Sequence, residues 1–105
     1  IVEIPTSLAK LTKLSHLSLS SNRICGNIPS CLSKLRKLQL LALGNNKLEG
    51  EFPVWIEDMH SLTELSIYKN KLTGYILYFL STITINYEVV YIIIYDYDYI
   101  LIHVL

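Results

Sequence analysis

The sequence predicts a solenoid of stacked coils, because one phrase recurs along the chain at a fixed spacing. Asn22, Asn46 and Asn70 are evenly spaced and define a 24-residue period. Around them, seven positions match in all three copies, as L-x-x-L-x-L-x-x-N-x-L-x-G-x-[IF]. A period of this length is typical of repeat proteins, in which each unit buries its apolar side against its neighbours. Such coils share one continuous face, and the sequence does not say what that face binds.

Each copy begins with a segment whose spacing predicts a short strand. Two apolar residues stand two positions apart, so both face inward from an extended chain. These pairs are Leu17 with Leu19, Leu41 with Leu43, and Leu65 with Ile67. The residues between them, Ser18, Ala42 and Ser66, are therefore expected to point outward.

The end of each copy predicts a bend and a return segment. The side-chain amides of the three asparagines are expected to hydrogen-bond to backbone groups at the bend, and stacking makes them a ladder. Gly26, Gly50 and Gly74 suit a bend that needs a positive φ or a close backbone approach. Pro29 and Pro53 open the return segment, where a fixed φ suits the first turn of a short helix.

This phrase resembles the leucine-rich repeat family, and within it the plant extracellular subclass. The resemblance covers residues 4 to about 85 and extends to Ile28-Pro29 with the leucines that follow. It implies an α/β solenoid, an arc with short parallel strands on the concave side and short helical turns on the convex side. It also implies work by recognition, so any kinase activity of such receptors would belong to a separate domain.

The repeat pattern weakens toward the C-terminus. We expect residues 1–85 to form the repeats, with a partial repeat over 1–13 and further repeats from 14, 38 and 62. Residues 86–105 are a degenerate fourth repeat, a cap strand or a non-native hydrophobic tail. Counting one further period places Val89 and Tyr91 as inward residues of one more strand, but Ile94 in the asparagine position.

Three interpretations of the tail compete. It is a strand that caps the last coil, translated non-coding sequence, or a transmembrane helix. Caps tend to have a polar outer face, which favours the second interpretation over the first. Glu88, Asp96 and Asp98 leave no uninterrupted apolar stretch of the length that a membrane helix requires.

Composition argues against several functions. The formal net charge is zero, so no charge excess predicts nucleic-acid binding, and Lys34, Arg36 and Lys37 suit a solvated convex face. The three histidines are scattered, and no His or Cys pair has metal-ligand spacing. We expect no enzyme activity, no cofactor and no metal. Cys25 and Cys31 occupy different parts of the coil, so we expect free thiols.

The candidate site is the set of outward positions on and beside the strands. These stack in columns across neighbouring coils: His16, Leu40 and Glu64; Ser18, Ala42 and Ser66; Ser20, Gly44 and Tyr68; Ser21, Asn45 and Lys69. In the third coil a tyrosine stands among charges of both signs, which is typical of an interface anchor. The ligand-binding residues we predict are His16, Ser18, Ser20, Leu40, Asn45, Glu64, Ser66, Tyr68 and Lys69. Ordinary solvated strand residues would give the same pattern.

The function favoured by the sequence is recognition of a protein or peptide, or of a co-receptor, by a fragment of a plant receptor ectodomain. The resemblance implies an extracellular location, or a membrane association only through a segment of the parent protein. We expect no signal peptide from this sequence, and the lack of an N-x-[ST] sequon weakens this location. The alternatives are a truncated or mis-spliced product without independent function, and an intracellular scaffold that assembles through its ends.

Overall fold

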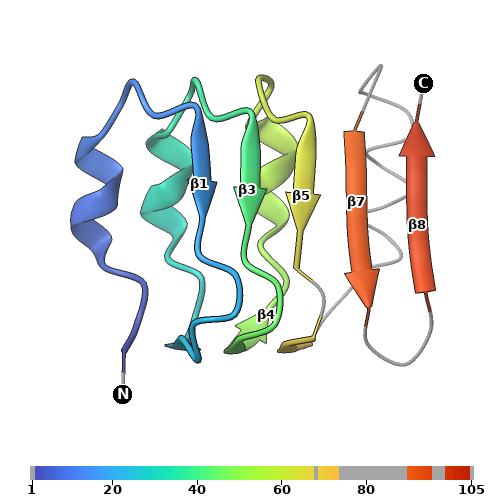
Figure 1. Cartoon of the computed structure of the whole chain (residues 1–105). Helices are drawn as coiled ribbons and strands as arrows, with labels where there is room; N and C mark the ends of the chain where they lie inside the picture. The colour runs from blue at the N-terminus through green and yellow to red at the C-terminus, as the bar shows by residue number, and fades with distance from the viewer. Residues whose placement is uncertain (1, 68, 74–89, 96–98, 105) are drawn as a thin grey trace.

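The computed structural model describes residues 2–67, 69–73, 90–95 and 99–104. The described part of the repeats contains concave strands, second short strands and 3-10 helices. The concave strands are β1 (His16–Ser18), β3 (Leu40–Ala42) and β5 (Glu64–Ser66). The second strands are β2 (Cys25–Gly26), β4 (Lys47–Glu51) and β6 (Lys71–Thr73). The helices are η1 (Thr6–Lys10), η2 (Ser30–Lys34) and η3 (Val54–Asp58), and β7 (Val90–Tyr95) and β8 (Tyr99–Val104) follow (Figure 1).

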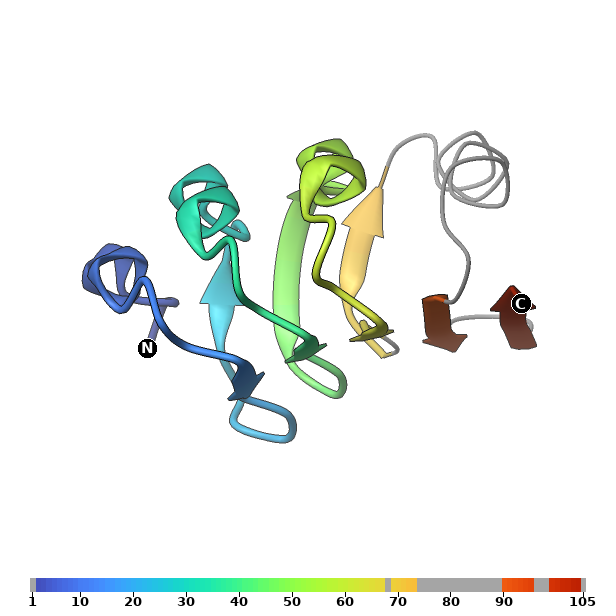
Figure 2. The same cartoon turned by 90° about the horizontal axis from the view of Figure 1, so that it is seen from above.

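The concave strands pair in parallel with the register that the period predicts. Leu17 pairs with Leu41, and Leu41 pairs with Leu65, so equivalent residues of the repeat lie side by side. Seen from above, the helices η1, η2 and η3 spread further apart than β1, β3 and β5, so the strands line the inner side of an arc (Figure 2). The predicted leucine-rich solenoid is confirmed.

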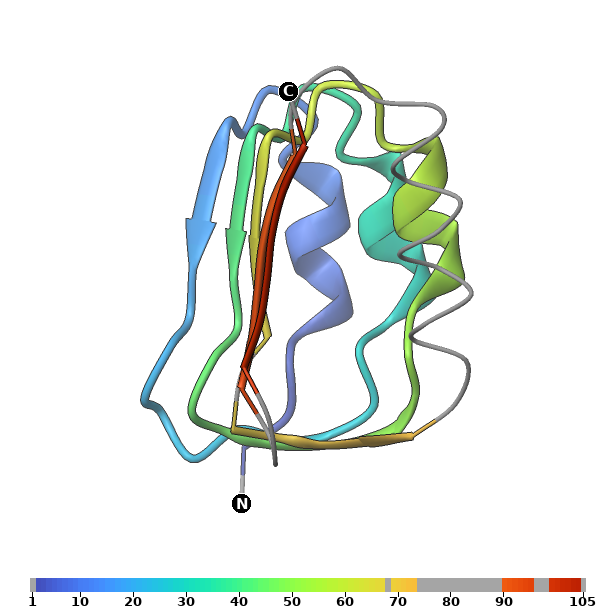
Figure 3. The same ribbon diagram turned by 90° about the vertical axis from the view of Figure 1, so that its right-hand side faces the viewer.

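Figure 3 shows the concave strands on one side of the solenoid and the helices on the other. One cluster of buried apolar residues forms the core. Its fully buried members are large apolar side chains of the repeat positions: Leu32, Leu35, Leu38, Leu41, Leu43, Leu48, Met59 and Leu65. Each position contributes one apolar residue per coil, and the coil on either side covers it. Burial therefore depends on having neighbours as much as on the residue itself.

Proline opens each return helix, as the sequence predicts. Pro5, Pro29 and Pro53 are the residues that precede η1, η2 and η3, with φ of −71°, −68° and −74°. These values lie in the range that the pyrrolidine ring imposes. The ring therefore prepares the chain to enter the helix at no further conformational cost.

A second parallel sheet, β2-β4-β6, is a feature that the sequence reasoning missed. It forms where we predicted only a bend. Cys25 pairs with Lys47, and Glu49 pairs with Lys71, so each partner stands two positions short of the repeat equivalent. Gly26 and Gly50 lie inside these strands with φ of 80° and 88°, so the predicted positive φ is confirmed for both, and Gly74 lies outside the described residues.

The last parallel strand does not keep the repeat spacing. Leu65 of β5 pairs with Ile92 of β7, whereas the period predicted Val89 as its partner. Tyr91 consequently lies opposite Glu64, an outward position, rather than opposite the inward Ile67. The chain between β5 and β7 is longer than the period allows, which shifts the register. β8 then pairs antiparallel with β7 and ends the parallel order.

Candidate functional site

The concave sheet separates inward from outward residues by simple alternation. Leu17, Leu41 and Leu65 are 7%, 0% and 0% exposed. The residues on either side of them in each strand point away from this core. Hydrogen-bonded register places His16, Leu40 and Glu64 in one row, and Ser18, Ala42 and Ser66 in a second. Adjacent members of a row belong to paired strands, which lie about 4.8 Å apart.

His16 is the outward residue at the start of β1. Its side chain is exposed, and Ser15 Oγ lies 2.8 Å from its Nδ1. A serine hydroxyl can donate to or accept from a ring nitrogen, so this contact orients the imidazole in either tautomer. The Nε2 side of the ring remains available to hydrogen-bond to a ligand.

The column that ends the concave face has a backbone conformation that the sequence reasoning did not predict. Ser21, Asn45 and Lys69 have φ of 61°, 55° and 50°, all in the left-handed region. Of these three residue types, only asparagine adopts that conformation with some ease. Asn45 Nδ2 donates to Ser21 Oγ at 3.0 Å, which links this column across two coils. The shared conformation sends the chain out of each strand in the same direction.

The predicted amide ladder is present directly beneath this column. Asn46 Oδ1 accepts hydrogen bonds from the backbone N–H groups of Asn22 and Ile24, both at 3.0 Å, in the preceding coil. Its Nδ2 donates to Leu19 O at 2.9 Å in that coil, and to Leu43 O at 3.0 Å in its own. The side chain therefore joins two coils and closes the bend.

Asn70 repeats the arrangement one coil later. Its Oδ1 accepts from the Leu48 N–H at 3.0 Å, and its Nδ2 donates to Leu43 O at 2.9 Å. Asn22 differs, because its side chain is exposed and its Nδ2 donates to Ser20 O within the same bend. Asn46 and Asn70 each reach back to the coil before them, so the ladder holds the concave face in register.

The structure places the predicted site residues with unequal access. Five of them are exposed: His16, Ser18, Asn45, Glu64 and Lys69. Ser20 and Leu40 are half-buried, and Tyr68 lies outside the described residues. Ser66 differs from the prediction, because it is only 9% exposed. Its backbone pairs with Ala42 on one side and Ile93 on the other.

The chemistry available on this face is hydrogen bonding and ion pairing. It presents an imidazole, small hydroxyls, an amide, a carboxylate and an ammonium group, spread over three coils. Among the residues that the structure describes, no group of three or more His, Cys, Asp or Glu side chains could hold a metal ion. Cys25 and Cys31 are free thiols, and they contact Val2 O at 3.5 Å and Thr6 O at 3.8 Å respectively.

No helix in the described part of the chain has the length and apolar character needed to cross a membrane.

The chain belongs to the leucine-rich repeat family, since the model of that family matches residues 12–72. It is similar to solved structures of plant receptors. With PEPR1 in the PEPR1–AtPEP1 structure it shares 31% identity and a TM-score of 0.76, covering 90% of this chain and 13% of that one. With RGFR1, a plant peptide hormone receptor in complex with RGF2, the identity is 36% and the TM-score 0.70, over 88% and 15% of the two chains.

A third similar structure is the leucine-rich repeat ectodomain of the receptor kinase SOBIR1 from Arabidopsis thaliana. The identity is 28% and the TM-score 0.70, covering 89% of this chain and 49% of that one. The chain thus spans less than half the length of each of these three receptors. No curated protein sequence matches it significantly. It is a leucine-rich repeat module of the plant type, similar to receptor ectodomains.

Proposed function

We propose that this chain recognises a protein or peptide through its concave sheet, as a segment of a plant receptor ectodomain. The observation that carries the proposal is the register of β1, β3 and β5. It aligns exposed side chains of different chemistry over a buried apolar core. The binding residues would be His16, Ser18, Ser20, Leu40, Asn45, Glu64 and Lys69, together with Tyr68, and Ser66 only if a ligand reaches its covered hydroxyl.

The similar structures support this proposal by the complexes that they contain. PEPR1 is seen with AtPEP1, and the peptide hormone receptor RGFR1 with RGF2. A protein or peptide ligand, or a co-receptor, is accordingly the class of partner that we propose here. An extracellular location, or one at the plasma membrane through the parent protein, follows from the same likeness. Small exposed polar residues predominate in the first coil, so the third coil would provide most of the binding energy.

Charge reversal on the concave face tests the proposal. A random peptide library displayed on phage is selected against the full chain, and the enriched peptides are titrated against variants. Glu64→Lys and Lys69→Glu should weaken binding about tenfold or more, because each reverses a charge within the contact. Asp58→Lys on η3 and Lys71→Glu on β6 make the same charge changes outside the concave face and should alter binding less than twofold. Peptides that respond equally to both pairs would contradict the concave proposal.

We also propose that residues 86–105 act as a cap on the last coil. The parallel pairing of β7 with β5, followed by the antiparallel β8, supports this interpretation over a non-native tail. Deletion of residues 86–105 should lower the urea midpoint of unfolding, because it uncovers the edge of β5. An unchanged midpoint would favour the non-native tail instead.

A further inference from the structure

Three cations stand at the asparagine bends of three successive coils. Arg23, Lys47 and Lys69 come one from each coil, each next to the asparagine of its bend, and we call them the basic bend. Residues 4–48, which include the whole of the first coil, contain no Asp or Glu. The net charge of zero therefore conceals a local excess of positive charge, which attracts partners of the opposite sign.

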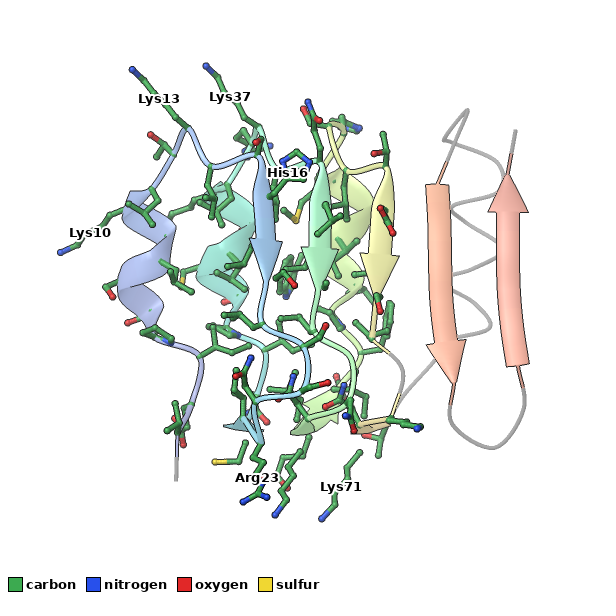
Figure 4. All side chains as sticks on the ribbon, viewed as in Figure 1. Lys10, Lys13, His16, Arg23, Lys37 and Lys71 are labelled. Carbon is green, nitrogen blue, oxygen red and sulfur yellow. The ribbon has the colours of Figure 1, made fainter. Side chains whose placement is uncertain are left out.

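Backbone hydrogen bonds between coils place these three residues next to one another. The Lys47 N–H donates to Ile24 O at 2.7 Å, directly after Arg23. The N–H of Asn46, directly before Lys47, donates to Lys69 O at 3.2 Å. All three cationic side chains are exposed, and none forms an ion pair with another described residue. Arg23 projects away from the concave strands at the lower end of the molecule in Figure 4.

Lys71 differs from these cations because a carboxylate stands beside it. Glu49 of β4 and Lys71 of β6 are register partners, on strands that lie about 4.8 Å apart. Both side chains are exposed, so opposite charges are neighbours there. Lys47 pairs with Cys25 instead, which carries no negative charge to offset it. The positive charge of the basic bend is therefore less compensated than that of Lys71.

The backbone of the basic bend is in an unfavourable conformation at two of its three positions. Arg23 and Lys69 have φ of 55° and 50°, in the left-handed region that long side chains rarely adopt. Asn45 takes the same conformation at the position equivalent to Lys69, and asparagine tolerates it better. A cation at these positions therefore lowers stability relative to asparagine, and such strain gathers at ligand-binding sites.

We propose that the basic bend binds a short acidic segment, with at least two carboxylates, of the peptide that the concave sheet recognises. This inference rests on the proposed function, to which it adds the charge of the partner and the place where that charge binds. The three cations come from successive coils, so the segment crosses the strands instead of following one of them. Lys69 belongs to both surfaces, which makes the basic bend continuous with the concave face.

A long polyanion such as a nucleic acid fits this surface less well. Glu49 and Glu51 are exposed on β4, and Glu64 is exposed on the concave face of the third coil. These carboxylates would repel a phosphate backbone that extends beyond the three cations. The charge of the basic bend therefore suits a few carboxylates and not a polymer.

Peptides selected from a random phage library against the full chain supply the probes. Each enriched peptide is synthesised in an acidic form, with its own Asp and Glu residues, and in a neutral form, with Asn and Gln in their place. We expect the enriched peptides to be rich in Asp and Glu. Arg23→Gln/Lys47→Gln should weaken binding of the acidic form about tenfold, because it removes two charges from the contact. This loss should shrink as salt rises, and the neutral form should show almost none of it.

The matched control removes the same two residue types elsewhere. Lys34→Gln/Arg36→Gln also replaces one exposed lysine and one exposed arginine, at η2 and just after it. It should reduce the affinity of the acidic form less than about twofold. Equal losses in the two double variants would reduce the effect to net charge and overturn the proposal.

Glu64→Lys separates this inference from the proposed function on which it rests. It acts on the concave face away from the basic bend, so it should weaken both forms of a peptide. Peptides that respond to Glu64→Lys but not to Arg23→Gln/Lys47→Gln would overturn the basic bend and leave the concave site intact. Peptides that respond to neither would overturn both. Equal affinity for a DNA duplex and for the acidic peptides would assign the basic bend to nucleic acid and overturn the peptide proposal.

Discussion

Successive repeats carry related sequence but experience different surroundings. Leu35, in the repeat that begins at residue 14, is fully buried, while Leu11 at the equivalent position of the partial repeat over residues 1–13 is 51% exposed. Asn46 is buried and joins two coils, while Asn22 is exposed. Residues at the same repeat position therefore contribute different amounts to the free energy of unfolding. Each contribution depends on whether a neighbouring coil covers the residue.

The asparagine ladder offers the largest test of this comparison. Asn46→Ala should lower the free energy of unfolding by about 4 kcal/mol, because it leaves the buried Ile24 N–H and the part-buried Asn22 N–H without an acceptor. Asn22→Ala should cost about 1 kcal/mol or less, since its amide serves one exposed contact. Urea denaturation followed by circular dichroism measures both. An equal loss of stability in the two variants would mean that the exposed Asn22 and the buried Asn46 contribute equally, contrary to the structure.

Leu35 and Leu11 allow the same comparison for apolar side chains, which form no hydrogen bonds. Leu35→Ala should destabilise the fold by about 3 kcal/mol, because it creates a cavity between two coils. Leu11→Ala should cost about 1 kcal/mol or less, as its side chain is half in water already. The two midpoints of urea unfolding give the difference. A large loss at Leu11 would show that something covers the first coil in solution.

The two glycines of the second sheet differ in what surrounds them. A Cβ at residue 50 would lie 2.5 Å from Asn27 Oδ1, whereas one at residue 26 would lie 3.1 Å from the side chain of Glu3. Both positions have positive φ, so alanine is strained at each. Gly50→Ala should cost about 2 kcal/mol and Gly26→Ala about 1 kcal/mol in thermal or urea unfolding. Asn27→Gly should recover part of the loss in the Gly50→Ala background and none in the other.

The sequence predicts the concave sheet well because its two determinants are local and periodic. Apolar alternation determines which side of each strand is buried, and the repeat period determines the register of β1, β3 and β5. The second sheet also had a signal, in the polar-apolar-polar triplets Lys47-Leu48-Glu49 and Lys71-Leu72-Thr73. Glycine next to these triplets indicated a bend instead, and its positive φ turned out to lie within strand pairing.

The features that could not be predicted depend on contacts between coils or on irregular spacing. The strand that pairs with β5 on its far side, β7, has a register that departs from the repeat period. The left-handed conformation at Ser21 and Lys69 has no signal in residue type, since neither prefers it.

The left-handed column supplies the smallest expected effect and bears on the candidate site itself. Lys69 and Asn45 occupy the same repeat position with φ of 50° and 55°, but only asparagine tolerates this conformation with some ease. Lys69→Asn should therefore stabilise the fold by about 0.5 kcal/mol, seen as a higher urea midpoint. Lys71→Asn, in a strand at a residue without positive φ, should give no gain. A gain at Lys69 would mean that lysine occupies a strained position at a cost to stability, as expected of a residue that serves binding. No gain would mean that lysine adopts this backbone conformation without strain. Backbone strain would then not support a role of Lys69 in binding.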